Sequence, residues 1–595
     1  MEYKSRSDVP EKYKWDLEDI YITEQDCLYN LDNIKDLLNK VVSFKGKIME
    51  SSDSLFNFYR ATESLDREFL KVFMYSHLYA DSDTTNDSYK KLKMKIDKLS
   101  EEISTKTSFV TPELLKEDYS KVLEYIKENK ALEEYKFDLE KIFRYKDHTL
   151  SEREEEIITE ALNTFGTPEE AFYNFDNADI KLGKIKNEDG KIVEVNHSNY
   201  IKFMNSKDRN VRKKAFQKMF DYYKNFKNTI AALSKGNIKE DFFLSKLKKF
   251  NSPLEMSLYN DNISVEVYKT LINTVHNNLD LMYDYMSIRK KALKLDSMHM
   301  WDIYVDLVNI RKEDIPFEEG KEILFKALRP LGDTYIEDLK KAFTEKWIDV
   351  YPSKGKKSGA YSWGSYDTKP YLLLNYNNTI DSLSTMAHEL GHSMHSFYSK
   401  TQNYIDSHYP IFLAEIASTV NEVILNDYLY KTAKTKEEKI LYLCDFLDKV
   451  RTTIYRQTMF AEFEMIMHDK EASLIPLTEK EFSDTYYKLN KLYYGKEVIS
   501  DDLIRYEWAR IPHFYTSFYV YKYATGLSAA LSIASRILKG DSKTCSDYIE
   551  FLKSGGNDYP LEILKKVGVD MTTPKPIEDA LSMFKDKLEE LKELL

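Results

Sequence analysis

The chain has 595 residues, which is too many for a single hydrophobic core, so the sequence predicts two or more lobes. Charged residues make up 31% of it and the formal net charge is −12 at pH 7, which argues against nucleic acid as a partner because such a partner requires a basic surface. The sequence contains neither an apolar run long enough to span a bilayer nor the apolar core of a signal peptide, so we expect no membrane partner.

The composition favours long helices. Glycine (17) and proline (14) are scarce, and lysine and glutamate are abundant. From about residue 25 to 165, apolar and aromatic side chains recur at helical spacing, which predicts an antiparallel helical lobe. A turn at residues 187–190 then predicts a hairpin, and helices are expected to resume at Asn199. We place a domain boundary here, with an N-terminal helical domain at 1–190 and a catalytic domain at 191–595.

The cysteines give an expectation about the compartment. There are three of them, Cys27, Cys444 and Cys545, and they lie far apart in the sequence. An odd number of widely spaced cysteines is typical of reduced thiols. We therefore predict a cytoplasmic protein.

The helical pattern breaks between Trp347 and Asn378. Residues 358–366 are rich in glycine and aromatic side chains, and residues 371–376 are typical of a strand, so a small hairpin is predicted here. An extended peptide can add to an exposed strand edge through main-chain hydrogen bonds, which makes Leu372 and Leu374 candidate substrate-binding residues. The alternative is a small sheet that only supports the next helix, and the residues alone favour neither.

That next helix carries the strongest chemical signal in the chain. Residues 388–392 contain the pattern H-E-x-x-H, in which His388 and His392 are four apart and face the same side of a helix. Two neutral imidazoles suit Zn²⁺, and a zinc-bound water can have a pKa of about 7. Glu389 is then placed to take a proton from that water. Asp381 or Ser382 is predicted to cap the helix.

A catalytic zinc needs a third protein ligand. One zinc-peptidase type places a histidine six residues after the second histidine, where this chain has Tyr398, and another places a glutamate nineteen residues after it, where this chain has Ile411. The next candidate is Glu415, in a stretch that is otherwise apolar or small and therefore predicts a buried helix with a buried carboxylate. Glu422 lies two turns further on the same face. It either holds a ligand histidine in place or pairs with a lysine or arginine.

Near the C-terminus, residues 512–526 are unusually aromatic. One interpretation is a core segment, which we prefer for Phe514 and Phe518. The other is a set of hydrogen-bond donors, because histidine and tyrosine can stabilise the oxyanion of a tetrahedral intermediate.

Taken together, these residues resemble the oligoendopeptidase F family of thimet-type zinc oligopeptidases, and the resemblance covers nearly the whole chain. It is carried by His388-Glu389-Leu390-Gly391-His392, then Glu415 in Leu-Ala-Glu-Ile-Ala-Ser-Thr, then Glu422. Further matching segments are residues 9–17, 166–171, 510–515 and 568–571.

The resemblance implies a mostly α fold in which two helical lobes flank a deep substrate channel, with a small β-hairpin or sheet beside the zinc helix. It also implies endopeptidase activity on oligopeptide substrates and one Zn²⁺ ion. Related enzymes use a histidine and tyrosines on the aromatic segment, which assigns His513 and Tyr523 to the oxyanion, with Tyr519 or Tyr521 as alternatives. Tyr519 is also a candidate substrate contact, and the resemblance favours substrate binding for Leu372 and Leu374.

The sequence thus predicts a zinc endopeptidase with His388, His392 and Glu415 on the metal and Glu389 as the base. A dipeptidyl carboxypeptidase of the same architecture is the nearest rival. It would need a cationic group for the substrate's C-terminal carboxylate, which the sequence does not assign. A non-catalytic helical scaffold is the rival of a different class, and the intact Glu389 argues against it.

Overall fold

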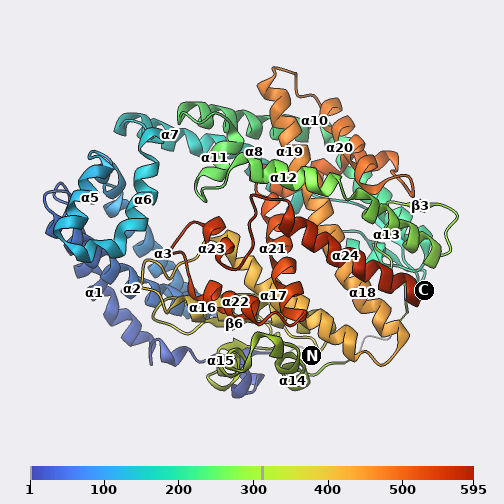
Figure 1. Cartoon of the computed structure of the whole chain (residues 1–595), viewed down its shortest axis with the longest axis horizontal. Coiled ribbons are helices and arrows are strands. Elements are labelled where there is room, and N and C mark those ends of the chain that lie inside the picture. The colour runs from blue at the N-terminus through green and yellow to red at the C-terminus, as the bar shows by residue number, and fades with distance from the viewer. Residues whose placement is uncertain (1–2, 310–313) are drawn as a thin grey trace. The chain divides into compact units, whose positions relative to one another are not determined.

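The structure is a computed structural model that describes residues 3–309 and 314–595 (Figure 1). The chain is mostly helical with small sheets, as predicted. It divides into two compact units, in agreement with the expectation of more than one lobe. Unit 1 comprises Met1–Asp147, Arg311–Leu425 and Ile533–Val569, and unit 2 comprises His148–Ile310, Asn426–Ser532 and Asp570–Leu595. The domain boundary proposed near residue 190 stays a prediction.

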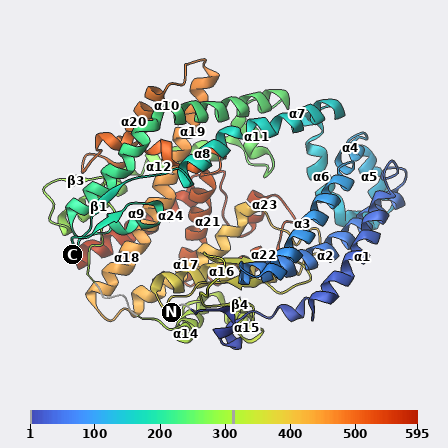
Figure 2. The ribbon, with the colours of Figure 1, turned by 180° about the vertical axis from the view of Figure 1, so that it is seen from behind.

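The first part of unit 1, up to Asp147, contains most of the helical region predicted for residues 25–165, and the rest of that region belongs to unit 2. The first α-helix of unit 1 begins with a capping box between Thr23 and Asp26. Its buried side chains follow a spacing of four and three residues, which gives the helix one apolar face. In both views α1, α2 and α3 run side by side (Figures 1 and 2). The helices are α1 (Glu24–Val42), α2 (Ser52–Ser82), α3 (Asp87–Thr107), α4 (Val110–Leu114), α5 (Tyr119–Glu128) and α6 (Lys136–Arg144).

Unit 1 also holds a three-stranded sheet. The predicted hairpin is confirmed as β5 (Tyr361–Trp363) antiparallel to β6 (Tyr371–Leu373). A further strand, β4 (Ile348–Asp349), pairs with β6 in parallel, so the strand order is β4-β6-β5. Tyr371 and Leu373 continue the apolar core of α1–α6 into the sheet.

The N-terminal segment is tied to this sheet by a buried ion network. Asp349 of β4 accepts from Arg6 at 2.7 Å and from Lys356 at 2.7 Å. Burial alone would raise the pKa of Asp349, but the two cations outweigh it and lower that pKa. The two ion pairs therefore attach the N-terminal segment, through Arg6, and the loop after β4, through Lys356, to the same buried carboxylate.

Of the remaining helices of unit 1, α16 (Ile380–Ser399) packs directly on this sheet. Helix α16 packs against β5 and α22. Thr379 caps it, since Thr379 Oγ1 accepts from the backbone N–H of Ser382 at 3.1 Å, so the predicted caps Asp381 and Ser382 are wrong. Thr379 is the last extended residue before the helix, which is the backbone conformation that an N-cap requires. The others are α14 (Phe317–Ala327), α15 (Asp333–Thr344), α22 (Ser542–Lys553) and α23 (Pro560–Lys566). Helices α17 (Ile411–Thr432) and α21 (Tyr521–Leu538) contribute residues to both units.

Unit 2 opens with α7 (Glu152–Phe165) and α8 (Thr167–Asn177), followed by the predicted hairpin, formed by β1 (Lys184–Lys186) and β2 (Ile192–Glu194). Helices resume at α9 (His197–Met204), two residues before the expected Asn199. The long helix α10 (Arg209–Leu247) is anchored at its start because Arg209 and Arg212 both bind the buried Asp302.

The other elements of unit 2 are α11 (Pro253–Tyr259), α12 (Val265–His276), α13 (Leu279–Ala292), β3 (Met298–His299), α18 (Lys436–Val450), α19 (Arg456–Ala472), α20 (Glu479–Tyr494), β7 (Val498–Ile499) and α24 (Lys575–Leu594). Strands β3 and β7 pair in parallel. A single π-helical turn, Arg451–Tyr455, joins α18 to α19. Among the described residues, none of the helices is both long and apolar enough to cross a membrane.

Candidate functional site

The two histidines of the H-E-x-x-H pattern meet on one face of α16. The Nε2 atoms of His388 and His392 are 3.1 Å apart. A helix turn of 3.6 residues places side chains four apart above one another, which accounts for this approach. The spacing of four residues therefore places both imidazoles on one face of the helix, as the sequence predicted.

Glu415 on α17 completes a group of three. Its Oε2 lies 3.5 Å from Nε2 of His388 and 3.8 Å from Nε2 of His392. The ligand atoms of all three residues lie within 4.8 Å of one another. We call these three residues the metal cluster. The expectation that the Glu415 carboxylate is buried is wrong, because its side chain is 46% exposed although its neighbours on α17 are buried.

The close approach of α16 and α17 depends on Gly391. A Cβ atom at this position would lie 2.5 Å from the Cα of Ser418 and 2.7 Å from the carbonyl oxygen of Ala417. Since no side chain fits there, the two helix backbones come together at this point. This residue lies inside the motif, but the sequence analysis gave it no role.

Glu422 orients the first histidine. Its Oε1 accepts from Nδ1 of His388 at 2.5 Å, so Nε2 is left facing the other two residues. Burial lowers the pKa of His388, but the hydrogen bond to Glu422 and the surrounding carboxylates outweigh this and raise it. The partner of His392 is the backbone of Ala414 and not a carboxylate, and burial together with the charge of His388 lowers the pKa of His392 to about 3.

Glu389 lies beside this group in a buried position. Burial raises the pKa of its carboxyl group to about 7, with a further contribution from Glu415 and an opposing one from His388. The backbone N–H of Ser362, on β5, hydrogen-bonds to the same carboxylate. The outer edge of β5 therefore faces Glu389.

The prediction that strand residues 371–376 offer a free edge to a peptide is wrong. Strand β6 is central, and its backbone is paired with β4 on one side and β5 on the other. Leu372 and Leu374 are fully buried, so they are not available to a substrate. The two-residue strand β4 gave no sequence signal. The two edge strands of the sheet are β4 and β5, and the edge that faces Glu389 is that of β5.

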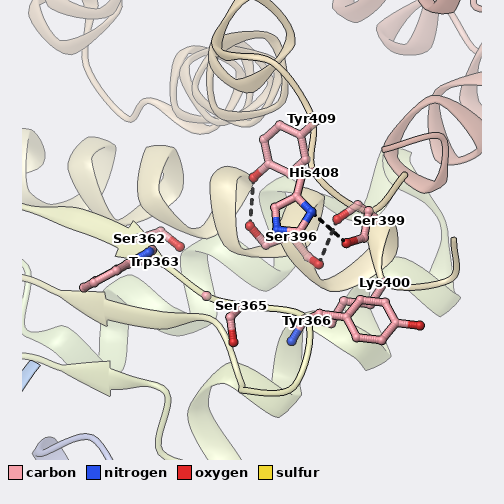
Figure 3. Close-up of a pocket in the computed structure, with 11 residues that line it drawn as sticks. Ser362, Trp363, Ser365, Tyr366, Ser396, Ser399, Lys400, His408 and Tyr409 are labelled. Carbon is pink, nitrogen blue, oxygen red and sulfur yellow. Dashed lines mark hydrogen bonds between the residues drawn. The ribbon is translucent and has the colours of Figure 1, made fainter. Parts of the chain in front are cut away.

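Beyond Ser362 a cavity opens between β5 and the C-terminal turns of α16 (Figure 3). Ser396 and the Tyr409 hydroxyl are hydrogen-bonded at 2.7 Å on one side of it. Under Tyr409 lies the buried ring of His395, with ring centroids 3.7 Å apart. The loop that carries Tyr409 is therefore stacked onto the same helix as the metal cluster.

In unit 2, His513, Tyr519 and Tyr523 lie together. His513 Nε2 and the Tyr523 hydroxyl are 3.2 Å apart, and the Tyr519 ring stands edge-on to Tyr523 with centroids 5.5 Å apart. All three are partly exposed, whereas Tyr521 is fully buried against Tyr268. Burial and the charge of Arg456 lower the pKa of His513, so its ring is neutral at pH 7. Of the tyrosines considered, Tyr519 and Tyr523 remain available and Tyr521 does not.

We call residues 512–523 the aromatic segment. It contains Phe518, which is buried and has φ = +60°. A bulky residue in the left-handed region is unfavourable and needs outside support. That support comes from Glu464 on α19, whose Oε1 accepts from the Phe518 N–H at 3.0 Å, and from Ser517, which donates to Asp241 at 2.6 Å. Sequence reasoning missed Glu464, which lies 54 residues before its partner.

Comparisons with known proteins agree with the motif. Residues 202–583 match the profile of peptidase family M3, and residues 113–181 match the profile described as oligopeptidase F. Oligopeptidase PepF of Bacillus subtilis is 40% identical over 591 residues, which are 99% of this chain and 88% of that protein. Group B oligopeptidase PepB of Streptococcus agalactiae is 39% identical over 592 residues, covering 99% of this chain and 98% of that one.

Two solved structures are similar over almost the whole chain. A protein from Chlamydophila abortus superimposes with a TM-score of 0.93 and 37% identity, covering 100% of both chains. Oligoendopeptidase-F from Enterococcus faecium has a TM-score of 0.73 and 34% identity, covering 96% of this chain and 99% of that one.

Proposed function

The chain belongs to peptidase family M3, and we propose that it is a zinc-dependent endopeptidase that hydrolyses peptide bonds in short oligopeptides. The observation that supports this most directly is the convergence of His388, His392 and Glu415 around one point, with Glu389 beside them. Oligopeptides are the proposed substrates because the similar proteins are named oligopeptidases. The cytoplasm remains the predicted location.

The metal cluster fits a zinc ion. Two imidazole nitrogens on a tetrahedral zinc lie about 3.3 Å from each other, given Zn–N bonds of about 2.0–2.1 Å. The Nε2 atoms of His388 and His392 are 3.1 Å apart. Two imidazoles and one carboxylate are the donor set of a catalytic zinc, and Glu415 is exposed on the side that such a site keeps open. We therefore propose that these three residues are the ligands of one Zn²⁺ ion and that Glu422 holds His388 in place.

When bound, zinc supplies a Lewis acid that polarises the scissile carbonyl and makes water acidic. Glu389 then accepts the proton of the attacking water and passes it to the nitrogen of the leaving amine. A pKa of about 7 suits both steps, because the carboxyl group can take and give a proton near neutral pH. The Ser362 N–H keeps this carboxylate aimed in one direction.

We assign the oxyanion to His513 and Tyr523. The hydrogen bond between His513 Nε2 and the Tyr523 hydroxyl uses one proton. When a substrate displaces that bond, a neutral His513 with its proton on Nε2 and the Tyr523 O–H can each donate to a negatively charged oxygen. Tyr519 is the proposed substrate contact beside them. These roles rest on the family resemblance together with the clustering of the three side chains.

A peptide is proposed to bind along the outer edge of β5. Antiparallel strand addition uses main-chain hydrogen bonds, which suits an enzyme that accepts many sequences. The N–H of Ser362 supports this position because it lies on that edge and also faces Glu389.

The test is Glu389→Gln combined with metal analysis and a mixed peptide library. Glutamine keeps the shape of the side chain but cannot accept the proton, so turnover should fall by about 10²–10⁴-fold while one zinc per chain stays bound. Cleavage mapping on the wild type should give internal cuts in short peptides. Retention of more than about a tenth of the wild-type activity would show that Glu389 is not the base.

A further inference from the structure

The cavity beside β5 has a volume of about 200 Å³. One wall is the strand end and turn at residues 362–366, the floor is Ser396, Ser399 and Lys400 of α16 and the residue that follows it, and the other wall is residues 407–409 (Figure 3). We call it the β5 pocket. It starts at Ser362, whose N–H faces Glu389, so a peptide that lies on this edge passes over the pocket.

The pocket is lined mainly by hydroxyl groups and by one cation. Several of these hydroxyls already donate within the chain, since Ser365 donates to Thr368 Oγ1, Ser399 to the backbone oxygen of Ser396 and Ser407 to that of Tyr404. The lining of the pocket contains no aspartate or glutamate, although the chain as a whole carries a net charge of −12. Ser396 and Tyr409 form one hydroxyl–hydroxyl hydrogen bond, in which only one of the two protons is used. The other O–H can therefore donate into the pocket.

The cation is Lys400, which is only partly exposed. Its Nζ donates to the backbone oxygen of Thr368, and within the described part of the chain no carboxylate lies within 4.0 Å of it. Asp367 is occupied elsewhere, because Arg67 binds both of its oxygens, at 2.5 and 2.9 Å. Burial lowers the pKa of Lys400 to about 8, so it is charged at neutral pH. Asp367 opposes this shift only through space, and an ammonium group with one carbonyl acceptor and no carboxylate in contact is incompletely solvated.

We propose that the β5 pocket is a specificity subsite that takes an acidic side chain of the substrate, with Lys400 as the cationic partner. The inference rests on the proposed peptidase function. From Glu389 the floor of the pocket is seven to eleven residues along α16, a distance that corresponds to about three to five residues of extended peptide at rises of about 1.5 and 3.3 Å per residue. The acidic side chain therefore lies three to five positions from the scissile bond.

The test is a positional scan with quenched fluorescent peptides that place Glu or Gln, in turn, at each of the five positions on either side of the cut. Glu should be preferred over Gln by about tenfold in kcat/KM at one position, three to five from the cut, since only the charged side chain gains a charge-assisted hydrogen bond from Lys400. At the other positions the ratio should stay near one. A wild-type enzyme that cleaves the peptides but shows no such position overturns the subsite, whereas a chain that cleaves none of them overturns the proposed function instead.

Variants at Lys400 identify the partner. Lys400→Met should reduce the Glu/Gln ratio at that position to near one, Lys400→Arg should preserve a ratio above one, and Lys400→Glu should favour Lys over Gln there. The ratio is independent of the fraction of correctly folded enzyme, so any loss of the contact with Thr368 does not disturb the result. A Glu preference that survives in Lys400→Met would show that Lys400 only supports the turn at Thr368.

Discussion

The metal cluster and the aromatic segment are built in different ways. The cluster comes from α16 and from the part of α17 that belongs to unit 1, which residues 400–410 connect, and helical spacing sets the relation of His388 to His392. The aromatic segment is irregular, and its conformation depends on contacts with α10 and α19, which are distant in the sequence. The geometry of the metal cluster thus follows largely from the helical repeat of its sequence, whereas the conformation of the aromatic segment depends on hydrogen bonds to distant residues.

This difference has a consequence for how each region responds to change. Ligand residues on packed helices are positioned by many backbone hydrogen bonds, so a single side chain can be replaced without moving the others. In the aromatic segment, the left-handed backbone at Phe518 is retained only because its surroundings hold it. We therefore expect substitutions in the cluster to act on the metal alone, and substitutions that support the segment to act on several residues together.

The largest expected effect is on zinc binding, and it should differ between the two acids of α17, Glu415 and Glu422. Glu415→Ala should abolish zinc binding and activity, because it removes a ligand and leaves two. Glu422→Ala should weaken zinc binding only by about 10–100-fold, since it removes the group that orients His388. Zinc content after dialysis against a graded chelator measures both. Equal losses, or the reverse order, would mean that the roles of the two acids are exchanged.

In the aromatic segment, Tyr523→Phe should lower kcat by about 10²–10³-fold while zinc content and KM change little, because only an oxyanion donor is lost. Tyr521→Phe is the matched control, since its hydroxyl is buried and has no hydrogen-bond partner among the described groups. That control should keep its kcat. If Tyr519→Phe loses kcat and Tyr523→Phe does not, the donor is Tyr519.

Sequence patterns were sufficient to predict the elements in which side chains recur at a regular spacing. The helix of His388 and Glu389 and the hairpin before it follow from spacing and turn residues alone. The central position of β6 could not be predicted, because its second partner is the two-residue strand β4. The exposure of Glu415 was also misjudged, since a helix whose neighbouring residues are buried can still leave a single side chain half exposed. Phe518 shows the limit most clearly, because no local signal places a phenylalanine at positive φ.

Gly391 tests how closely the two helices of the metal cluster must approach. Gly391→Ala puts a methyl group against the backbone of Ser418, so the helices have to separate, at a cost of about 1–3 kcal/mol that outweighs the gain in helix propensity. Zinc affinity should fall together with the thermal stability. Gly526→Ala on α21 is the matched control, because nothing lies within 4 Å of its added Cβ, and it should stabilise by up to about 1 kcal/mol. Unchanged zinc affinity in Gly391→Ala would show that the cluster tolerates a wider spacing.

The smallest expected effect concerns the support of the aromatic segment. Burial raises the pKa of Glu464 well above its ordinary value, against the opposing effect of the Phe518 N–H, and this favours the neutral acid as the acceptor for that N–H. Glu464→Gln keeps a neutral acceptor of the same shape and should preserve kcat. Glu464→Leu leaves the buried N–H without an acceptor, which should cost about 1–3 kcal/mol of stability and lower kcat more than it changes KM, as the segment relaxes.

The pH dependence of stability distinguishes the two forms of the Glu464 side chain. An acid whose pKa is raised in the folded state contributes stability that is fully present below its unfolded pKa, about 4.3, and is lost as the pH rises through the folded value. Gln does not titrate, so the free energy of unfolding of Glu464→Gln relative to the wild type should increase as the pH rises from about 4.3 towards the folded pKa of Glu464. Urea denaturation of the wild type and both variants across this range measures it. A difference that stays constant with pH would mean that Glu464 is ionised in the folded protein and that the Phe518 N–H binds a carboxylate.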